Sequence, residues 1–384
     1  MAVSTYKVVK GDTLFGVAKK FGMTTNDLKT LNGLTTNNLS IGQTLKVKGQ
    51  SSGTTNPTTP PPVTIPPVST GANYLSARQQ FRLETRPDAG FNRYFLTVPL
   101  PGGGQVVANM RDNLTNSAHM VYPQGIMYAG QSRIELSTAT IQSVGLSVAQ
   151  AKALQYVSTH EGSFDAINSY DKAIFSYGFI QFTGAAAVGA SLNRVLASME
   201  ANAPTAFQNI FKRVGIDTEG VGKNALVTVL DDNGYKRSGD DAWLYIQRNV
   251  PLYGVFIQAG YESSLVREQL RMANELYVQP ALNFKLNVTV GGINISVPRL
   301  SDILTSEAAM TIVIALAINQ GNGGMSRIVA DAVSRVATQR RLNSLSTLRQ
   351  INEREVFETV VANTTDPRVR DRTTRVLNSG LSFA

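Results

Sequence analysis

The 384-residue sequence contains no cysteine and only two histidines, His119 and His160. The lack of cysteine excludes disulfides, thiolate nucleophiles and cysteine-based metal sites. Two imidazoles are too few for a histidine-rich zinc site. Asp165, Asn168 and Asp171 lie three residues apart, a spacing that lacks the alternating ligands and final glutamate of an EF-hand loop. We therefore expect neither a metal nor a cofactor.

Long apolar runs are also absent. The longest, around residues 310–318, is far shorter than the roughly 20 residues of a membrane-spanning helix, so we expect no membrane span. The first residues, MAVSTYKVVKGDTL, lack the basic, apolar and cleavage regions of a secretory signal peptide. We therefore expect the protein to reach its site of action within a virion, within an injection device, or after release by lysis.

The composition is that of a globular protein with a sizeable core, since 42% of the residues are hydrophobic and 16% are charged. A net charge of +9 favours an anionic partner, which could be nucleic acid, a membrane surface or a cell-wall polymer, but it serves solubility equally well. The arginine-rich tail from residue 327 onward has helical periodicity. Because no aromatic residues alternate with its arginines, we interpret it as a solvated helix face and expect no nucleic-acid partner.

A proline-rich, uncharged stretch, SSGTTNPTTPPPVTIPPVSTGA, follows the first 50 residues. Such a composition buries too little apolar surface to fold and favours extended polyproline II. We predict a flexible linker over residues 50–73 and a separate small domain over residues 1–49. In that domain, strand-like YKVVK is followed by two helix patterns and by strand-like IGQTLKVKG, which predicts the order βααβ. The first helix places Leu14, Val17, Ala18 and Phe21 on one face.

These N-terminal motifs resemble a LysM module over its whole length. The resemblance rests on Tyr6–Val9, Gly11–Leu14, Leu31–Asn32 and Ile41–Leu45. LysM modules bind polymers that contain N-acetylglucosamine, such as peptidoglycan or chitin, in a shallow groove between two loops. By position, the resemblance assigns this groove to Gly11, Asp12, Thr13, Leu14, Asn32, Leu39 and Ile41. A helix-capping role for Asp12 or Thr13 is compatible with that assignment.

Beyond the linker, we predict a multidomain α+β protein. Short alternating runs separated by Pro and Gly turns indicate a small β-rich unit of unassigned role over residues 74–140, with His119 as a structural residue. Residues 141–384 are mainly helical by pattern, with an insertion around residues 200–305. Within it, FKLNVTVGGINISVP predicts a hairpin that turns at Gly291-Gly292.

One stretch carries candidate chemistry: THEGSFDAINSYDKAIFSYGFIQFTG, residues 159–184. Ser147 is a plausible cap of a helix whose apolar face includes Leu154, Val157 and Glu161. Partial burial and the negative end of the helix dipole both favour a protonated Glu161. General-acid cleavage of a glycosidic bond requires such a group. From this stretch alone, a glutamate that ends a helix and points to solvent is an equally good interpretation.

The residues that follow resemble the lysozyme superfamily in the order helix, carboxylate, loop, second carboxylate, then an amphipathic strand or hairpin. Glu161, Asp171 and Ser176-Tyr177-Gly178 resemble the Glu, Asp and Thr-x-Gly series of phage-type lysozymes. Gly178–Gln181 and Ala317–Gly323 resemble later motifs of goose-type lysozymes and lytic transglycosylases. The resemblance implies that Glu161 is the general acid and Asp171 a second catalytic carboxylate. It assigns substrate binding to Gln181, Asn319, Ser176 and Tyr177.

The second carboxylate separates hydrolysis from transglycosylation. Lytic transglycosylases lack an essential second acid, so the availability of Asp171 favours hydrolysis. A separation from Glu161 of about 6.5–9.5 Å would suit activation of a water, and about 5–5.5 Å would suit a nucleophile. Asp165 is the alternative, but its spacing places it beside Glu161. The stretch between Gln181 and Asn319 is much longer than in the lysozyme families, so the cleft walls do not carry over.

Both halves of the sequence indicate the same substrate. The leading hypothesis is a peptidoglycan-degrading muramidase that cleaves between N-acetylmuramic acid and N-acetylglucosamine and is anchored by its LysM module. Other hypotheses are a lytic transglycosylase, a chitinase or chitosanase, and a catalytically inactive wall-binding component of a phage tail or contractile injection system. The last of these would have phage-tail or injection-machine proteins as partners.

Overall fold

The structure is a computed structural model that describes residues 3–8, 14, 17–18, 21, 23, 25–34, 39–40, 42–48, 74–113, 120–132, 137–185 and 190–383. It describes only the backbone of residues 3, 25–26 and 158–161. The linker, His119, the side chains of Glu161 and His160, and four residues of the expected groove therefore lie outside the described part: Gly11, Asp12, Thr13 and Ile41. The chain divides into two compact units, Met1–Ser69 and Thr70–Ala384.

The first unit has its own small core beneath a two-stranded antiparallel sheet of β1 (Val3–Lys7) and β2 (Thr44–Lys48), with Tyr6 opposite Leu45. Helix α2 (Thr25–Asn32) packs on β2. Leu14, Val17 and Ala18 are helical and buried, as their spacing predicts. The strands and helices described here have the predicted βααβ order.

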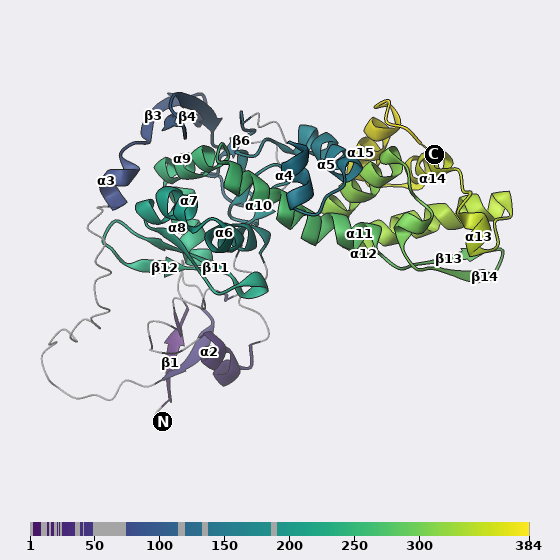
Figure 1. Cartoon of the computed structure of the whole chain (residues 1–384). Coiled ribbons are helices and arrows are strands. Elements are labelled where there is room, and N and C mark those ends of the chain that lie inside the picture. The colour runs from purple at the N-terminus through teal and green to yellow at the C-terminus, as the bar shows by residue number, and fades with distance from the viewer. Residues whose placement is uncertain are drawn as a thin grey trace, which may run out of the picture. The chain divides into compact units, whose positions relative to one another are not determined.

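The second unit contains a seven-stranded antiparallel sheet whose strand order follows the chain. It begins with two long hairpin strands and continues, without interruption, into the short strands that follow Glu161. The strands predicted before residue 140 therefore belong to the same sheet as the candidate site (Figure 1). Its strands are β3 (Arg82–Asp88), β4 (Phe91–Pro99), β5 (Gln105–Arg111), β6 (Met127–Tyr128), β7 (Ile167–Asn168), β8 (Ser176–Tyr177) and β9 (Phe182–Thr183).

One face of this sheet is the core face. Because side chains alternate along a strand, residues opposite one another share a face. The row Tyr128, Ile167, Tyr177 and Phe182 is paired across β6 to β9 and is buried. Helix α9 (Val250–Ala259) packs on β3 and β4 from this side. The other face of β3 to β5 carries charged and half-exposed side chains.

A second, three-stranded sheet and several helices complete this part of the unit. Trp243 is buried there, and its indole N–H donates to Asn193 Oδ1 at 2.9 Å. The strands are β10 (Ile216–Glu219), β11 (Leu226–Leu230) and β12 (Lys236–Ser238). The helices are α3 (Tyr74–Arg78), α4 (Thr138–Ser143), α5 (Val148–Glu161), α6 (Ser191–Asn202), α7 (Pro204–Ile210), α8 (Asp240–Arg248), α10 (Ser263–Ala273) and α11 (Gln279–Leu282), with a π-helical stretch over Asn274–Val278 and short 3-10 turns at Lys212–Val214, Gly222–Asn224 and Leu300–Asp302.

The C-terminal part is built on the long helix α12 (Glu307–Arg340). The predicted hairpin is confirmed as β13 (Leu286–Val290) and β14 (Ile293–Val297), which packs on α12. Gly291 and Gly292 make its turn, both with positive φ, as a type I′ turn requires. Helices α13 (Leu345–Leu348), α14 (Glu353–Asn363) and α15 (Pro367–Leu377) follow. Among the described residues, no helix combines the length and hydrophobicity needed to cross a membrane.

Candidate active site

Helix α5 ends at Glu161, as the sequence predicts. Ser147 and Gln150 cap its first turn reciprocally: the Ser147 hydroxyl accepts from the Gln150 N–H at 3.1 Å, and the Gln150 side chain accepts from the Ser147 N–H at 2.9 Å. Leu154 and Val157 are buried and fix the helix rotation. Gly162 then leaves the helix with φ of 141°, a conformation that L side chains rarely adopt.

The structure places Gln181 beside the residue that follows Glu161. A Cβ built on Gly162 would lie 3.7 Å from Nε2 of Gln181. Gln181 has φ of 57°, and its amide donates to the carbonyl of Gly178 at 3.0 Å, which closes the turn between β8 and β9. The end of α5 and the Gly178–Gln181 turn, 17 to 20 residues apart in sequence, thus meet in space.

Asp165 is a structural carboxylate. It is fully buried and accepts hydrogen bonds from the Tyr128 hydroxyl at 3.1 Å and from the backbone N–H groups of Gln131 and Ser132, both at 2.9 Å. Burial raises the pKa of Asp165, although these hydrogen bonds oppose the shift. A Cβ on Gly260 would lie 2.4 Å from Asp165 Cβ, so nothing fits between them. Asp165 therefore anchors the loop after Glu161 to neighbouring loops and does not face solvent.

Asp171 lies in the loop between β7 and β8 and is half-buried. One carboxylate oxygen accepts from the backbone N–H of Ala173 at 2.9 Å, and the other accepts from the side-chain amide of Asn168 at 3.2 Å. These bonds fix the direction of the carboxylate. Phe175 holds the end of the same loop, because its ring stacks on Trp243 with centroids 5.4 Å apart and meets the edge of Tyr253 at 5.3 Å.

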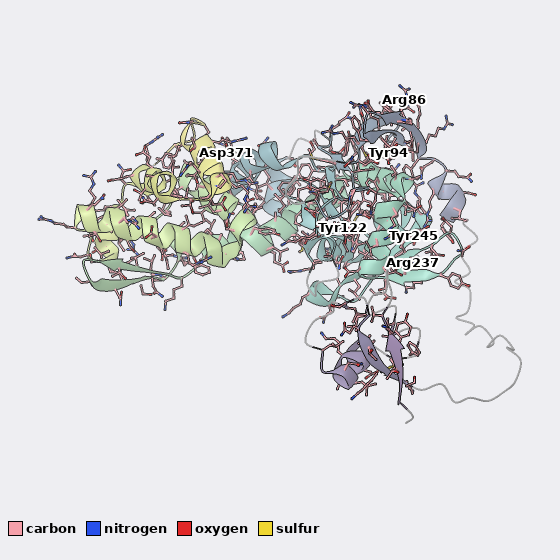
Figure 2. The ribbon with its side chains drawn as sticks, turned by 180° about the vertical axis from the view of Figure 1, so that it is seen from behind. Arg86, Tyr94, Tyr122, Arg237, Tyr245 and Asp371 are labelled. Atoms are coloured by element: carbon pink, nitrogen blue, oxygen red, sulfur yellow. The ribbon has the colours of Figure 1, made fainter. Side chains whose placement is uncertain are left out.

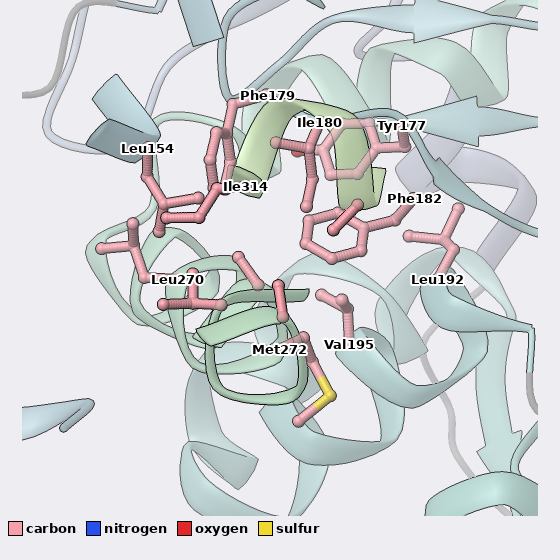
Figure 3. Packing of buried hydrophobic residues seen from close by; sticks show 14 of the residues in the cluster. Leu154, Tyr177, Phe179, Ile180, Phe182, Leu192, Val195, Leu270, Met272 and Ile314 are labelled. Atoms are coloured by element: carbon pink, nitrogen blue, oxygen red, sulfur yellow. The ribbon is translucent and has the colours of Figure 1, made fainter. Parts of the chain in front are cut away.

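Ser176 and Tyr177, two predicted substrate-binding residues, are buried. The Tyr177 hydroxyl donates to the backbone carbonyl of Phe256 at 2.8 Å, and burial raises the pKa of Tyr177 well above its ordinary value. The whole stretch from Ile174 to Ile180 is buried on both faces. The predicted hairpin is present as β8 and β9. It is not amphipathic as its alternation predicts, because core side chains surround it (Figure 3).

Asn319 lies on α12, two residues before the helix is interrupted at Gly321, which has φ of 67°. Its amide donates to the carbonyl of Ala315 at 2.9 Å, and its side-chain oxygen accepts from the guanidinium of Arg372. Next to it, Gln320 donates to the Asp366 carboxylate at 3.2 Å. The segment with the predicted cleft asparagine is thus attached to α15.

Helix α5 packs on α12 and is joined to α15 by a hydrogen bond. Lys152 near the start of α5 pairs with Glu307 at the start of α12, at 3.7 Å. Further along the two helices, Leu154 and Ile314 belong to one group of buried side chains (Figure 3). The Tyr156 hydroxyl donates to the carbonyl of Arg375 on α15 at 3.0 Å. The contacts run in the same order along α5 and α12, which places the C-terminal end of α5 toward the Asn319 segment.

A pocket of about 140 Å³ lies on one face of α15 and is lined by Arg368, Asp371, Arg372 and Arg375. Asp371, labelled in Figure 2, pairs with Arg375 at 2.9 Å. The sequence predicts a solvated helix face here, whereas Arg372 bonds to Asn319. The sequence does carry a signal for this cluster, because Asp371, Arg372 and Arg375 lie three, four and seven residues after Arg368 and so share one face of a helix. Among the described side chains, no group of three His, Asp or Glu residues could hold a metal ion.

In the N-terminal unit, three residues of the expected groove are described. Leu14 is buried in the core, and Leu39 is half-buried against it. Asn32 joins α2 to β2, since its amide donates to the carbonyls of Leu28 and Lys46, both at 2.8 Å, and its oxygen accepts from the Lys46 N–H at 2.6 Å. Asn32 therefore orients the second strand whether or not it also contacts a glycan.

Residues 6–48 match the LysM domain family, so the chain carries a LysM domain at its N-terminus. The same region is similar to bacterial proteins. It is 56% identical over 48 residues to a probable peptidoglycan endopeptidase, LytE, of Bacillus subtilis, covering 12% of this chain and 14% of that protein.

Two further relatives match the same part. The N-acetylmuramoyl-L-alanine amidase sle1 of Staphylococcus saprophyticus is 47% identical over 51 residues, 13% of this chain and 16% of the relative. The cell wall-binding protein YocH of Bacillus subtilis is 48% identical over 46 residues, 12% and 16% of the two chains. The chain thus spans less than a fifth of the length of these relatives. No solved structure matches the chain.

Proposed function

We propose that this protein is a peptidoglycan-degrading glycosidase of the muramidase type, held on the bacterial cell wall by its LysM domain. The LysM domain supports the wall association, and the names of its relatives are those of peptidoglycan and cell-wall proteins. The observation that carries the glycosidase proposal is the adjacency of Gln181 to Gly162, directly after Glu161. This adjacency supports the proposal, because it brings the backbone next to the candidate acid close to the amide that we propose binds sugar.

In this proposal, Glu161 protonates the leaving glycosidic oxygen between N-acetylmuramic acid and N-acetylglucosamine. Asp171 activates the attacking water or stabilises the positive charge that develops on the sugar. Gln181 and Asn319 orient the sugar by hydrogen bonds. Arg372 supports the proposed role of Asn319, because its hydrogen bond to the Asn319 side-chain oxygen holds that side chain in a fixed orientation. Ser176 and Tyr177 support the site from within the core.

Glu161→Gln tests the catalytic role. The amide keeps the shape of the carboxyl but supplies no proton, so turnover of purified peptidoglycan should fall by at least about a hundredfold. Co-sedimentation of the variant with insoluble peptidoglycan should stay unchanged, because the LysM domain is intact. If wild type and variant clear peptidoglycan equally poorly while both still sediment with it, the protein is a wall-binding structural component, such as one of a phage tail or injection device.

Product analysis separates hydrolysis from lytic transglycosylation. Hydrolysis adds a water, whereas transglycosylation leaves a 1,6-anhydro ring, so mass spectrometry distinguishes the products. If Asp171 is the second catalytic carboxylate, Asp171→Asn should abolish the hydrolytic product. Full activity of this variant together with anhydro products would assign the protein to the transglycosylases, and preferential turnover of chitin oligomers would assign it to the chitinases.

A second candidate function follows from the names of two relatives, an endopeptidase and an amidase. This sequence has no cysteine and only two histidines. It therefore offers no thiolate nucleophile and too few imidazoles for a histidine-rich metal centre. Release of amino groups from peptidoglycan without release of reducing sugar ends would nevertheless favour the peptide-bond or amide-bond activity.

A further inference from the structure

The solvent-facing side of the seven-stranded sheet carries a continuous row of side chains. Strand register places Arg86 opposite Arg93, Arg93 opposite Arg111, and Arg111 opposite Met127. Met127 is opposite Asn168, and Asn168 is opposite Ser176. Residues directly opposite one another in a sheet point to the same face. The row therefore runs from the edge strand β3 to the strands that flank Asp171.

This row lies on the face opposite the core. On β4, Leu96 and Val98 are buried, whereas the residues that alternate with them are half-exposed. The side chain of Arg93 is 42% exposed, Arg86 is 62% exposed, and Met127 is 49% exposed. Figure 2 shows Arg86 at the outer margin of the β3–β4 hairpin, with Tyr94 on the inner side. A ligand in solution can reach the row from Arg86 to Met127, whereas Ser176 at its far end is buried.

The first three strands make this face cationic and partly aromatic. Four arginines and two carboxylates alternate on its outward positions: Arg82, Arg86, Arg93, Arg111, Glu84 and Asp88. Guanidinium groups lie over two phenylalanine rings, Arg86 over Phe95 at 4.7 Å and Arg111 over Phe91 at 5.3 Å. Arg86 pairs with Glu84 at 2.6 Å and Arg93 pairs with Asp88 at 2.9 Å, whereas within the described part of the chain neither Arg82 nor Arg111 has a carboxylate within salt-bridge distance. The face thus offers positive charge beside apolar surface.

The row leads to the candidate active site. Adjacent strands are about 4.8 Å apart, so the four steps from β3 to β7 span roughly 19 Å. At the β7 end, the amide of Asn168 donates to the Asp171 carboxylate at 3.2 Å. A polymer bound across the site could therefore continue along the same face without crossing the core side of the sheet.

We propose that the outer face of β3, β4 and β5 binds the carboxylate-bearing side groups of a glycan strand beyond the bond that is cleaved. The arginines recognise the carboxylates, and the phenylalanine rings and Met127 contact the apolar faces of the sugars. This inference rests on the proposed function and gives a role to the strands before residue 140. Its chemical requirement is an anionic glycan: a neutral strand of the same length would bind this face more weakly.

The test uses the full chain with Glu161→Gln, so that strands are bound without being cleaved. Fluorescent glycan strands carrying stem peptides are compared with the same strands after their carboxyls are converted to neutral amides. We expect tighter binding of the carboxylated strands, measured by fluorescence anisotropy at low ionic strength. Arg86→Gln, Arg93→Gln and Arg111→Gln together should weaken that binding by about tenfold and bring it to the affinity of the amidated strands.

The matched control replaces three exposed, ion-paired arginines on α12 and α14: Arg335→Gln, Arg340→Gln and Arg354→Gln. It changes the net charge equally and should retain the preference for carboxylated strands. Equal affinity of the unsubstituted face for both strands, or equal losses in the two triple variants, would overturn the proposal. The proposal would also be overturned if the substitutions of Arg86, Arg93 and Arg111 weakened the binding of a single-stranded DNA probe but not that of the glycan strands, which would favour nucleic acid as the ligand.

Cleavage is followed separately in the protein with Glu161 intact. If that protein leaves the glycan uncut while the arginine-dependent binding preference persists, the proposed glycosidase function fails and the binding face stands. If cleavage occurs without any such preference, the glycosidase function stands and the binding face fails.

Discussion

At the scale of single residues, the carboxylates near Glu161 differ in surroundings and hence in the roles open to them. Asp165 is fully buried and accepts hydrogen bonds from the Tyr128 hydroxyl of β6 and from two backbone N–H groups of the loop that follows β6, and burial raises its pKa. Asp171 is half-buried and held by two local donors. The burial of Asp165 is therefore a geometric reason to set it aside, and Asp171 remains the second acid in the proposal.

Tyr177→Phe tests whether this tyrosine supports the core or contacts substrate. Removing the hydroxyl deletes one buried hydrogen bond to the Phe256 carbonyl, which keeps the bond from the Gly260 N–H, so the free energy of unfolding should fall by about 1 kcal/mol in urea titrations. Because the hydroxyl is buried, kcat/KM on soluble glycan strands should not change. Tyr235→Phe, at a tyrosine that is 72% exposed, is the control and should alter neither quantity. Reduced turnover at unchanged stability would instead place Tyr177 in the cleft.

At the scale of elements, helix ends position the candidate site. Ser147 starts α5, and Gly162 ends it after Glu161. The start of α12 is capped by Ser306, whose N–H and hydroxyl both donate to the buried Glu353 of α14. Asp366 caps α15, accepting from the Arg368 N–H at 2.8 Å and from the Gln320 amide. Each cap satisfies backbone donors that would otherwise be left without partners at a helix start.

Asp366→Ala should destabilise the protein by about 1 kcal/mol near neutral pH, the usual effect of losing an N-cap. The Arg368 N–H, donating to the carboxylate, holds the pKa of Asp366 below its ordinary 3.8. A lowered folded-state pKa means that this stability is complete above the unfolded pKa and is lost as pH falls through the folded value. The difference in unfolding free energy between wild type and variant should therefore be constant above about pH 5 and shrink below pH 4.

The control for this prediction is Asp331→Ala, which removes one exposed ion pair with Arg335. It should cost no more than about 0.5 kcal/mol. Circular dichroism during urea titration at a series of pH values measures both variants. A difference for Asp366→Ala that grows as the pH falls would contradict the assigned cap.

At the scale of the whole molecule, two compact units are joined through a proline-rich stretch. The small unit is a LysM domain, and the large unit carries the candidate site. Joining a wall-binding module to a catalytic unit raises the effective concentration of the site at the wall without any new contact to the scissile bond. Affinity for the insoluble wall and chemistry on the glycan should therefore be separable.

Deletion of residues 1–50 should reduce co-sedimentation with insoluble peptidoglycan and slow its turnover by about tenfold or more. Turnover of soluble glycan fragments should be unchanged, because the larger unit has its own core. The two activities are measured side by side on the full and shortened chains. An equal loss on soluble fragments would show that the larger unit depends on the LysM domain.

The sequence by itself determined the features that rest on local patterns. The apolar spacing of Leu14, Val17 and Ala18 specifies the small core of the LysM domain, the Ser147 cap and Gly162 bound the helix that ends at Glu161, and Gly291-Gly292 specifies a hairpin. In each, a few neighbouring residues set backbone conformation through capping, periodicity or positive φ.

Only the tertiary structure decided which side chains lie together and which are buried. Gln181 meets Gly162, and Arg372 meets Asn319. Tyr177 joins the row of core side chains, whereas its sequence neighbour Ser176, which is paired with Asn168, lies on the opposite face of the sheet. The seven-stranded register likewise aligns Arg86, Arg93 and Arg111 with the candidate site. Local alternation shows that two faces exist, but the long-range packing of helices decides which face is covered.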